Sequence, residues 1–146
     1  MEITPLLNLD LCSPLIYAKT TNLPSEIHEN EEFLLIYELN PLQSRSIEPE
    51  KASLLGQLLF IGRKYTSGEL LAHDTNAEKA VLPSGNYLFL QCRANAALGR
   101  EEWLDMVIEQ QKDGLWERKK LESKLYVRFL FEDGQFVTQV YRPVLF

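Results

Sequence analysis

Aromatic rings recur along the apolar segments of this chain. Tyr37, Tyr87, Phe89 and Tyr126 each stand in a run of residues that favours a β-strand. Such rings can line a cleft that holds a flat apolar ligand, or they can fill the core of a sheet. Both interpretations are open at the level of the sequence, and the four rings are therefore candidate ligand-binding residues.

One acidic residue, Glu38, stands inside the apolar run 33–39. A carboxylate beside a buried surface is costly unless it is paired, so Glu38 is a candidate for a buried charge in a binding site. The alternative is that Glu38 marks the solvated end of a strand, because Asn40 and Pro41 follow it as turn residues. Glu38 joins the candidate ligand-binding residues with this alternative beside it.

Residues that hold metals or act as nucleophiles form no recognisable pattern. Cys12 and Cys92 lie far apart without CxxC or Cys/His spacing, so each is expected to be a small buried side chain, with a disulfide as the alternative. His28 and His73 stand alone among polar residues, without a Ser, Cys or Asp partner at a telling spacing. The sequence thus predicts no catalytic residue, no metal site and no cofactor.

The charge of the chain argues against a nucleic-acid partner. The formal net charge is −6, and the basic residues concentrate only at 118–124, where Glu122 interrupts them. A nucleic-acid-binding surface needs a basic stripe that displaces counterions from phosphates. The apolar N-terminal residues 1–19 lack a basic leading segment and contain Asp10 and two prolines, so they fit neither a signal peptide nor a membrane span. We expect a cytoplasmic protein that binds no nucleic acid directly and no membrane.

The elements of the N-terminal half are predicted to be strands joined by polar loops. Two short apolar runs in residues 1–20, split by Ser13 and Pro14, indicate one broken strand or two short ones. After a turn-rich acidic loop at 21–31, the run 33–39 has the composition of a buried strand.

The next stretch of the chain is less distinct. A strand is favoured at 57–61 between two glycines, with a short helix within 48–60 as the alternative. A hairpin is then expected to lead into residues 69–73.

Residues 80–146 are predicted to form one αβ unit. A strand covers 87–92, and helical spacing of apolar residues predicts a helix at about 99–113 that ends before Gly114. A hairpin follows, because Asp133 and Gly134 separate two apolar runs.

In this hairpin, Leu125, Val127 and Phe129 are expected to face one side of the sheet, and the residues between them the other. Pro143 is expected to end the last strand. The whole chain, 1–146, is then a single α+β domain with a mainly antiparallel sheet and one or two helices.

Three features of residues 81–144 match a known pattern. The segment Val81–Phe89 has a Pro-small-Gly-x-Tyr strand entry, Trp103 stands in the helix that follows, and the end of the chain reads Tyr-x-Pro-Val at Tyr141–Val144. In these features the chain resembles the GyrI-like small-molecule-binding domains, which are the effector-binding domains of multidrug-responsive transcription regulators and also exist as stand-alone proteins.

The resemblance implies two pseudo-symmetric βαββ halves with a groove between them. In that family, planar apolar cations stack on aromatic rings of the groove, and a carboxylate supplies the countercharge. The resemblance implies that Trp103 flanks the groove and that Glu122 supplies the carboxylate, although Glu122 lies further from Tyr126 than the family's glutamate lies from its tyrosine.

Three functions follow as hypotheses. The first is non-enzymatic binding of a small apolar or cationic molecule by an effector-binding protein that has no DNA-binding segment of its own. The second is a hydrolase on the same scaffold, in which a groove glutamate positions water within reach of a tyrosine hydroxyl. The third is a protein-interaction module whose acidic loop Glu26–Glu32 docks a basic partner, and pairing with a second copy of the chain as a homodimer is a further alternative.

Overall fold

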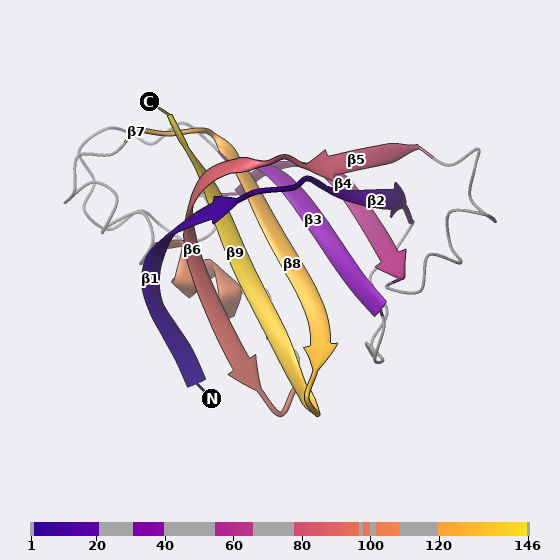
Figure 1. Ribbon diagram of the computed structural model, residues 1–146, viewed down its shortest axis with the longest axis vertical. Coiled ribbons are helices and arrows are strands. Elements are labelled where there is room, and N and C mark those ends of the chain that lie inside the picture. The colour runs from indigo at the N-terminus through magenta and orange to yellow at the C-terminus, as the bar shows by residue number, and fades with distance from the viewer. Residues whose placement is uncertain are drawn as a thin grey trace.

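A computed structural model describes residues 2–20, 31–39, 55–65, 78–96, 98–99, 102–108 and 120–145, which form one curled antiparallel sheet with a helix on one side (Figure 1). The strands in chain order are β1 (Glu2–Leu11), β2 (Leu15–Lys19), β3 (Glu31–Leu39), β4 (Leu55–Tyr65), β5 (Lys79–Leu82), β6 (Gly85–Ala94), β7 (Lys120–Leu121), β8 (Lys124–Glu132) and β9 (Gln135–Leu145). Residues 102–108 are helical.

The strand order is β1–β6–β9–β8–β3–β4–β2–β5, with the short strand β7 paired to β9. Every one of these pairs is antiparallel. The two ends of the order are connected through the chain, because β1 leads into β2 and β5 leads into β6. Along this route β1 pairs with β6 and β2 pairs with β5, so the four strands form one bent ribbon.

The ribbon bends where the sequence has turn residues. The pairing passes from Leu11 opposite Gly85 to Leu15 opposite Leu82. Gly85 has a φ of 148°, a backbone conformation that residues with a Cβ rarely adopt. Beyond the bend, β2 also pairs with β4. The order of paired strands therefore begins at one end of the ribbon and finishes at its other end. The sheet is curled as a result.

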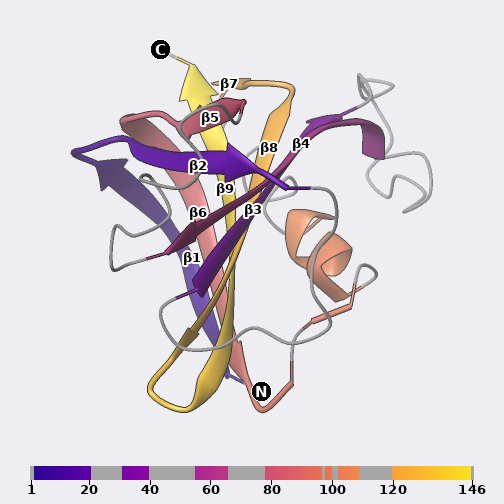
Figure 2. The same cartoon turned by 90° about the vertical axis from the view of Figure 1, so that its right-hand side faces the viewer.

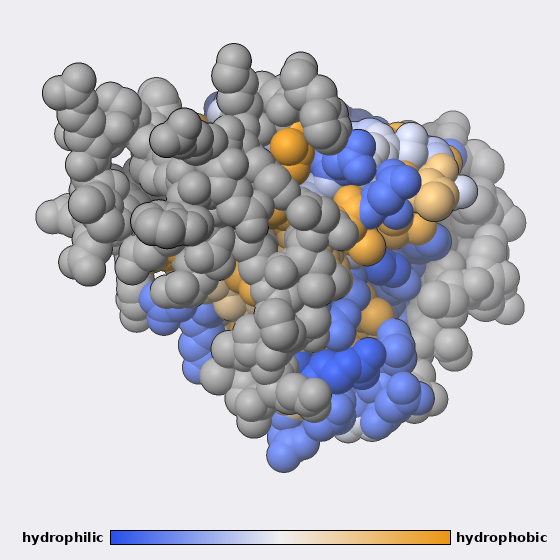
Figure 3. Space-filling view, turned by 60° about the vertical axis from the view of Figure 1, so that its left-hand side comes forward, coloured by the Kyte–Doolittle hydropathy of each residue, from blue (hydrophilic) through white to orange (hydrophobic). Residues whose placement is uncertain are grey.

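We call β2 and β5 the arm. In Figure 1 the arm lies in front of β3, while the helix lies behind β6 and β9, and Figure 2 shows the same two elements on opposite sides of the sheet. The sheet therefore has a helix face and an arm face. The hairpin between β8 and β9 lies at the lower end, where Asp133 and Gly134 have φ of 53° and 75° as a tight turn requires. Figure 3 shows that this lower end is hydrophilic.

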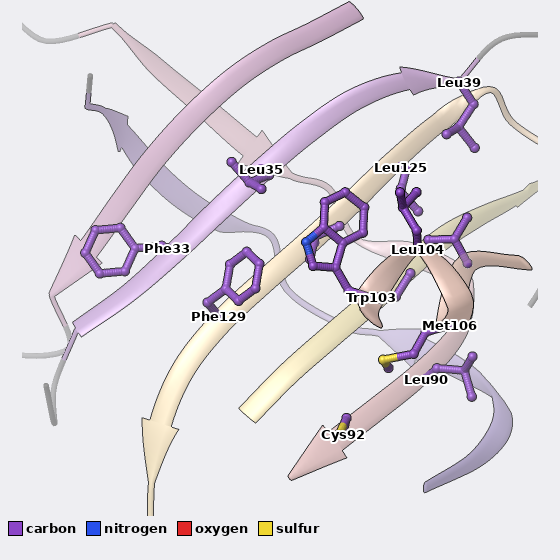
Figure 4. Close-up of a cluster of buried hydrophobic side chains, with 13 residues drawn as sticks. Phe33, Leu35, Leu39, Leu90, Cys92, Trp103, Leu104, Met106, Leu125 and Phe129 are labelled. Carbon is purple, nitrogen blue, oxygen red and sulfur yellow. The ribbon is translucent and has the colours of Figure 1, made fainter. Parts of the chain in front are cut away.

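The helix face carries an apolar core. Trp103, Met106 and Val107 of the helix pack on side chains of β3, β6, β8 and β9, and Figure 4 shows the indole of Trp103 pointing toward β3 and β8. The buried members are Phe33, Leu35, Leu39, Leu90, Cys92, Trp103, Leu104, Met106, Val107, Leu125, Val127, Phe129 and Val140. Because charged side chains are lacking in this set, burial of apolar area is what holds the helix to the sheet.

The arm face carries a second cluster, which is rich in tyrosine. Its buried members are Tyr17, Leu34, Ile36, Phe60, Leu82, Tyr87, Phe89, Tyr126 and Tyr141. The same strands supply both clusters, because successive side chains of a strand point to opposite faces. Phe33 and Leu35 thus lie on the helix face, and Leu34 and Ile36 lie on the arm face.

These observations confirm several predictions. Residues 1–20 form two strands separated by residues 12–14, and the strands at 33–39, 57–61 and 87–92 are present within longer ones. The mainly antiparallel α+β class and the alternation of Leu125, Val127 and Phe129 with their neighbours are confirmed as well. The expected hairpin at 69–73 and the helical residues 109–113 lie outside the described residues.

Three predictions were wrong. Cys12 is exposed rather than buried. Glu31 and Glu32 begin β3 instead of belonging to a loop, and Glu32 is buried. Pro143 does not end β9, which continues to Leu145. The hydrogen bond made at this position uses the carbonyl of Pro143, which accepts the Glu122 N–H at 3.0 Å, so the N–H that proline lacks is not needed there.

Candidate functional site

The arm face brings together four aromatic rings on neighbouring strands. Phe89, Tyr141 and Tyr126 are register partners across β6, β9 and β8. Tyr87 packs against two of them edge to face, with ring centroids 5.5 Å from Tyr141 and 6.3 Å from Tyr126. Phe89 lies 5.1 Å from Tyr141 in a similar arrangement. We call these four residues the aromatic layer; they are at most 7% exposed.

A buried ion pair lies on the same face, toward the hairpin end. Arg128 Nη2 donates to Glu32 Oε1 at 2.8 Å, and Arg128 Nε donates to Glu32 Oε2 at 3.1 Å. The side chains of Arg128 and Glu32 are 16% and 9% exposed. Tyr17 of the arm adds a third bond, since its hydroxyl donates to Glu32 Oε2 at 3.0 Å. Both oxygens of Glu32 are thus occupied, which leaves this carboxylate poorly placed to orient a water molecule.

Two glutamines extend this polar cluster across the sheet. Arg128 Nη1 donates to Gln139 Oε1 at 3.0 Å, and the Tyr141 hydroxyl donates to the same oxygen at 2.7 Å. Gln139 Nε2 then donates to Gln91 Oε1 at 2.8 Å. Gln91, Gln139 and Arg128 are register partners, so they form a polar row beside the aromatic layer. Tyr141 belongs to both, because its ring packs in the layer and its hydroxyl bonds in the row.

The arm reaches this cluster because of a glycine. Lys19, two residues after Tyr17, pairs with Gly62 of β4. A Cβ added at Gly62 would lie 2.9 Å from Tyr17 Cβ and 2.2 Å from Phe60 Cε1. Both distances are shorter than real contacts allow, so a side chain at this position would push the arm outward. The absence of a side chain at Gly62 therefore lets the hydroxyl of Tyr17 meet Glu32.

At the opposite end of the aromatic layer, the backbone of Glu122 is held to β9 at two points. Its N–H donates to the Pro143 carbonyl at 3.0 Å, and its carbonyl accepts from Arg142 Nη2 and Nε at 2.9 and 3.2 Å. The residue is partly exposed. Its negative charge is close enough to act electrostatically on Tyr87 and Tyr126. The backbone of Glu122 is thus held next to Pro143, the register partner of Tyr87, at this end of the aromatic layer.

The tyrosines of this face hold their protons firmly. Burial raises the pKa of Tyr17, Tyr87, Tyr126 and Tyr141, because the charged phenolate would lose its hydration. The charge of Glu122 raises the pKa of Tyr87 and Tyr126 further. These hydroxyls therefore stay protonated at neutral pH, and those of Tyr17, Tyr87 and Tyr141 donate hydrogen bonds. That of Tyr87 donates to the Pro83 carbonyl at the bend of the ribbon.

The residues predicted from the sequence are divided between the two faces. Tyr87, Phe89 and Tyr126 lie together on the arm face. Tyr37 and Trp103 lie on the helix face, where their rings are 5.6 Å apart. Trp103 is 3% exposed in the apolar core, so it does not face the aromatic layer.

Glu38 is neither deeply buried nor fully solvated. It pairs with Lys124 in the register of β3 and β8, and it shares the arm face with Ile36, two residues before it. The Ser123 hydroxyl donates to Glu38 Oε1. Glu38 thus stands at the same end of the sheet as Glu122, which follows from the adjacency of Ser123 and Glu122.

The sequence did not single out Glu32, Arg128, Tyr17, Gln139 or Gln91. One signal was present, because the alternation along 124–131 placed Arg128 on the face of Tyr126. A charged residue at an inward position of a buried strand needs a partner. Glu32 directly precedes the apolar run that pairs with this strand, but the pairing of β3 with β8 joins residues 96 positions apart. That pairing is a fact of topology, which local patterns do not reveal.

Within the described part of the chain, no group of three or more His, Cys, Asp and Glu side chains could hold a metal ion. No helix among the described residues is long and apolar enough to cross a membrane. Comparison with known proteins gave no match, whether against protein-family models, curated proteins or solved structures. The resemblance to GyrI-like domains stays a prediction.

Proposed function

We propose that this chain binds a small, flat, apolar cation without chemical conversion, at the end of the arm face where Glu122 adjoins Tyr87 and Tyr126. The observation that carries the proposal is the backbone of Glu122, which is held at two points next to Pro143, the register partner of Tyr87, while its charge acts on Tyr87 and Tyr126. Aromatic faces attract cations, and a nearby carboxylate adds a charge that a neutral core would not contain.

The charges on the arm face favour a cation at this end rather than at the other. Glu32 is neutralised by the paired Arg128. Glu122 has no ion pair among the described residues, and Glu38 adds a second carboxylate at the same end. Among the described residues, this end has the carboxylates of Glu122 and Glu38 on one side of the balance, and on the other the positive charges of Lys124 and of Arg142, which bonds the Glu122 carbonyl from the helix face.

The strand pairing supports the two-halves part of the proposal. The ribbon strand β1–β2 and the hairpin strands β3 and β4 correspond to the ribbon strand β5–β6 and the strands β8 and β9. In each set the ribbon strand pairs with the last strand, the last pairs with the middle one, and the middle strands β3 and β8 pair with each other. A pseudo-twofold relation of this kind is what the GyrI-like resemblance implies.

Two free cysteines, Cys12 and Cys92, are consistent with a reducing compartment, and we propose a cytoplasmic effector-binding role. The ligand class then resembles that of multidrug-responsive regulators, as planar organic cations. Affinity in the micromolar range, about −8 kcal/mol, is the expectation for one stacked ring and one ion pair.

Titration of the fluorescent planar cation ethidium tests the site. Glu122→Gln removes the charge and keeps the shape, and we expect it to weaken binding roughly tenfold. Glu132→Gln is the matched control, because Glu132 lies at the hairpin end, where it pairs with Arg93 at 3.2 Å. This variant makes the same change in net charge and is expected to leave the affinity unchanged.

A second variant addresses the rings. Tyr126→Leu keeps an apolar side chain but removes the aromatic face, and it is expected to weaken ethidium binding while circular dichroism shows the fold retained. Equal loss of affinity in Glu122→Gln and Glu132→Gln would mean that binding follows overall charge, and the site assignment would then be wrong. Absence of binding by ethidium and by other planar cations would remove the proposal itself.

A further inference from the structure

Arg142 is a buried arginine on the helix face, and part of its guanidinium is unpaired within the described part of the chain. The residue is 5% exposed. Nε and Nη2 both donate to the Glu122 carbonyl, whereas Nη1 is buried and has no hydrogen-bond partner among the described residues. Alternation along β9 places Arg142 on the side of Val140, opposite Tyr141. The free nitrogen therefore does not belong to the cation site of the arm face.

The positive charge of Arg142 also lacks an acidic partner among the described residues. A carbonyl oxygen accepts hydrogen bonds but does not carry the full negative charge that would balance a guanidinium. No ion pair joins Arg142 to an acid in the ranges that the structure describes. Burial alone lowers the pKa of Arg142 to about 10. Buried charges in proteins are paired or coordinated, so this one calls for an anion.

The charge and the hydrogen-bond donors of the other buried arginine, Arg128, are satisfied by neighbouring side chains. Arg128 meets the carboxylate of Glu32 with two nitrogens, and its Nη1 bonds to Gln139. All three of its nitrogens have partners. In Arg142, by contrast, Nε and Nη2 have a hydrogen-bond acceptor, and Nη1 has none among the described residues. Arg142 is nevertheless the more deeply buried of the two arginines.

We propose that Arg142 binds an oxyanion, the carboxylate or phosphate group of a small molecule, through its free Nη1. This nitrogen carries two N–H donors, and arginine is the side chain best suited to carboxylate and phosphate oxygens. Leu88, the register partner of Arg142, and Val140 are apolar neighbours, so the bound charge would be little screened by salt. The inference does not depend on the proposed cation site.

The test measures the thermal midpoint of unfolding in inorganic phosphate, in acetate and in chloride at constant ionic strength. We expect a saturable rise, roughly 5 °C at an anion concentration tenfold above Kd, because a ligand of the folded state stabilises it. The phosphate and acetate arms distinguish a phosphate from a carboxylate ligand. Arg142→Gln is expected to abolish the rise, and Arg93→Gln, which removes a more exposed arginine, to keep it.

Two outcomes would overturn the inference. One is a wild-type protein without a saturable response to either anion, since a rise that grows without limit reflects only salt exclusion from the surface. The other is a response that persists in Arg142→Gln. If that variant fails to fold, a nitrogen–proton NMR titration of the wild-type protein tests the site instead. A bound oxyanion must shift the guanidinium resonance of Arg142, and an unmoved resonance would contradict the site.

Discussion

Each face of the sheet buries one arginine, Arg128 or Arg142, and the two arginines differ in their hydrogen-bond partners. On the arm face, Arg128 is held by a carboxylate, a glutamine and a tyrosine hydroxyl within one polar row. On the helix face, Arg142 has one carbonyl oxygen and, within the described residues, an empty nitrogen beside an apolar core. The arm face thus has its charge compensated internally next to the hairpin and leaves a carboxylate, Glu122, at its other end.

This difference separates structural roles from candidate functional ones. A fully bonded ion pair is a feature of the fold, since nothing remains on it for a ligand to bind. Groups with unused capacity, which are Glu122 on one side and Arg142 Nη1 on the other, are where a ligand would gain free energy. The two groups are linked, because the backbone of Glu122 is what Arg142 holds.

The largest effect is expected from the helix face. Trp103→Ala removes a side chain that is 3% exposed, and we expect a loss of about 4 kcal/mol in the free energy of unfolding, measured by urea denaturation. Leu59→Ala, at a residue that is 44% exposed, is the control and should cost much less. Ethidium affinity of the milder variant Trp103→Phe should equal that of the wild type. A clear loss there would place Trp103 in the site after all.

The next effect concerns the ion pair of the arm face. Glu32→Gln leaves Arg128 as a buried charge without its partner, and we expect it to cost about 3 kcal/mol of stability. The double variant Glu32→Leu with Arg128→Met removes both charges and should recover most of this loss. If the double variant is as unstable as the single one, the packing around Tyr17, and not the unpaired charge, accounts for the cost.

A smaller effect is expected at alkaline pH. Tyr17, Tyr87, Tyr126 and Tyr141 have a raised pKa in the folded protein, so the folded state retains protons that the unfolded state loses with the ordinary tyrosine pKa of 10.0. Their contribution is complete below pH 10 and is lost as pH rises above it. Tyr17→Phe should make this decline less steep. Tyrosinate absorbance in which the signals of these four tyrosines rise near pH 10, with the fold intact, would contradict the burial.

Local patterns in the sequence predicted the elements well where turn chemistry and alternation agreed. Asp133 and Gly134 predicted the hairpin, and the broken strand of residues 1–20 followed from Ser13 and Pro14. Pro143 misled, because its missing N–H matters only where a donor is required, and there the carbonyl does the bonding.

The site was harder to predict than the fold, for a topological reason. Tyr87, Phe89 and Tyr126 were candidates because of residue type, and the pairing of β6, β9 and β8 brings them together. Tyr37 differs from these three residues in the face that it occupies, because the odd-numbered residues of β3 point to the helix face. Glu32 meets Arg128 only through the pairing of β3 with β8, which no single segment encodes.

The central claim is that a cation binds on the arm face and not on the helix face. The most direct measurement is an NMR titration of the wild-type protein with ethidium, in which side-chain signals of both faces are followed together. We predict that the ring resonances of Tyr87 and Tyr126 shift and saturate, while the indole N–H of Trp103 does not move. Saturating shifts at Trp103 with unmoved tyrosine rings would contradict the claim.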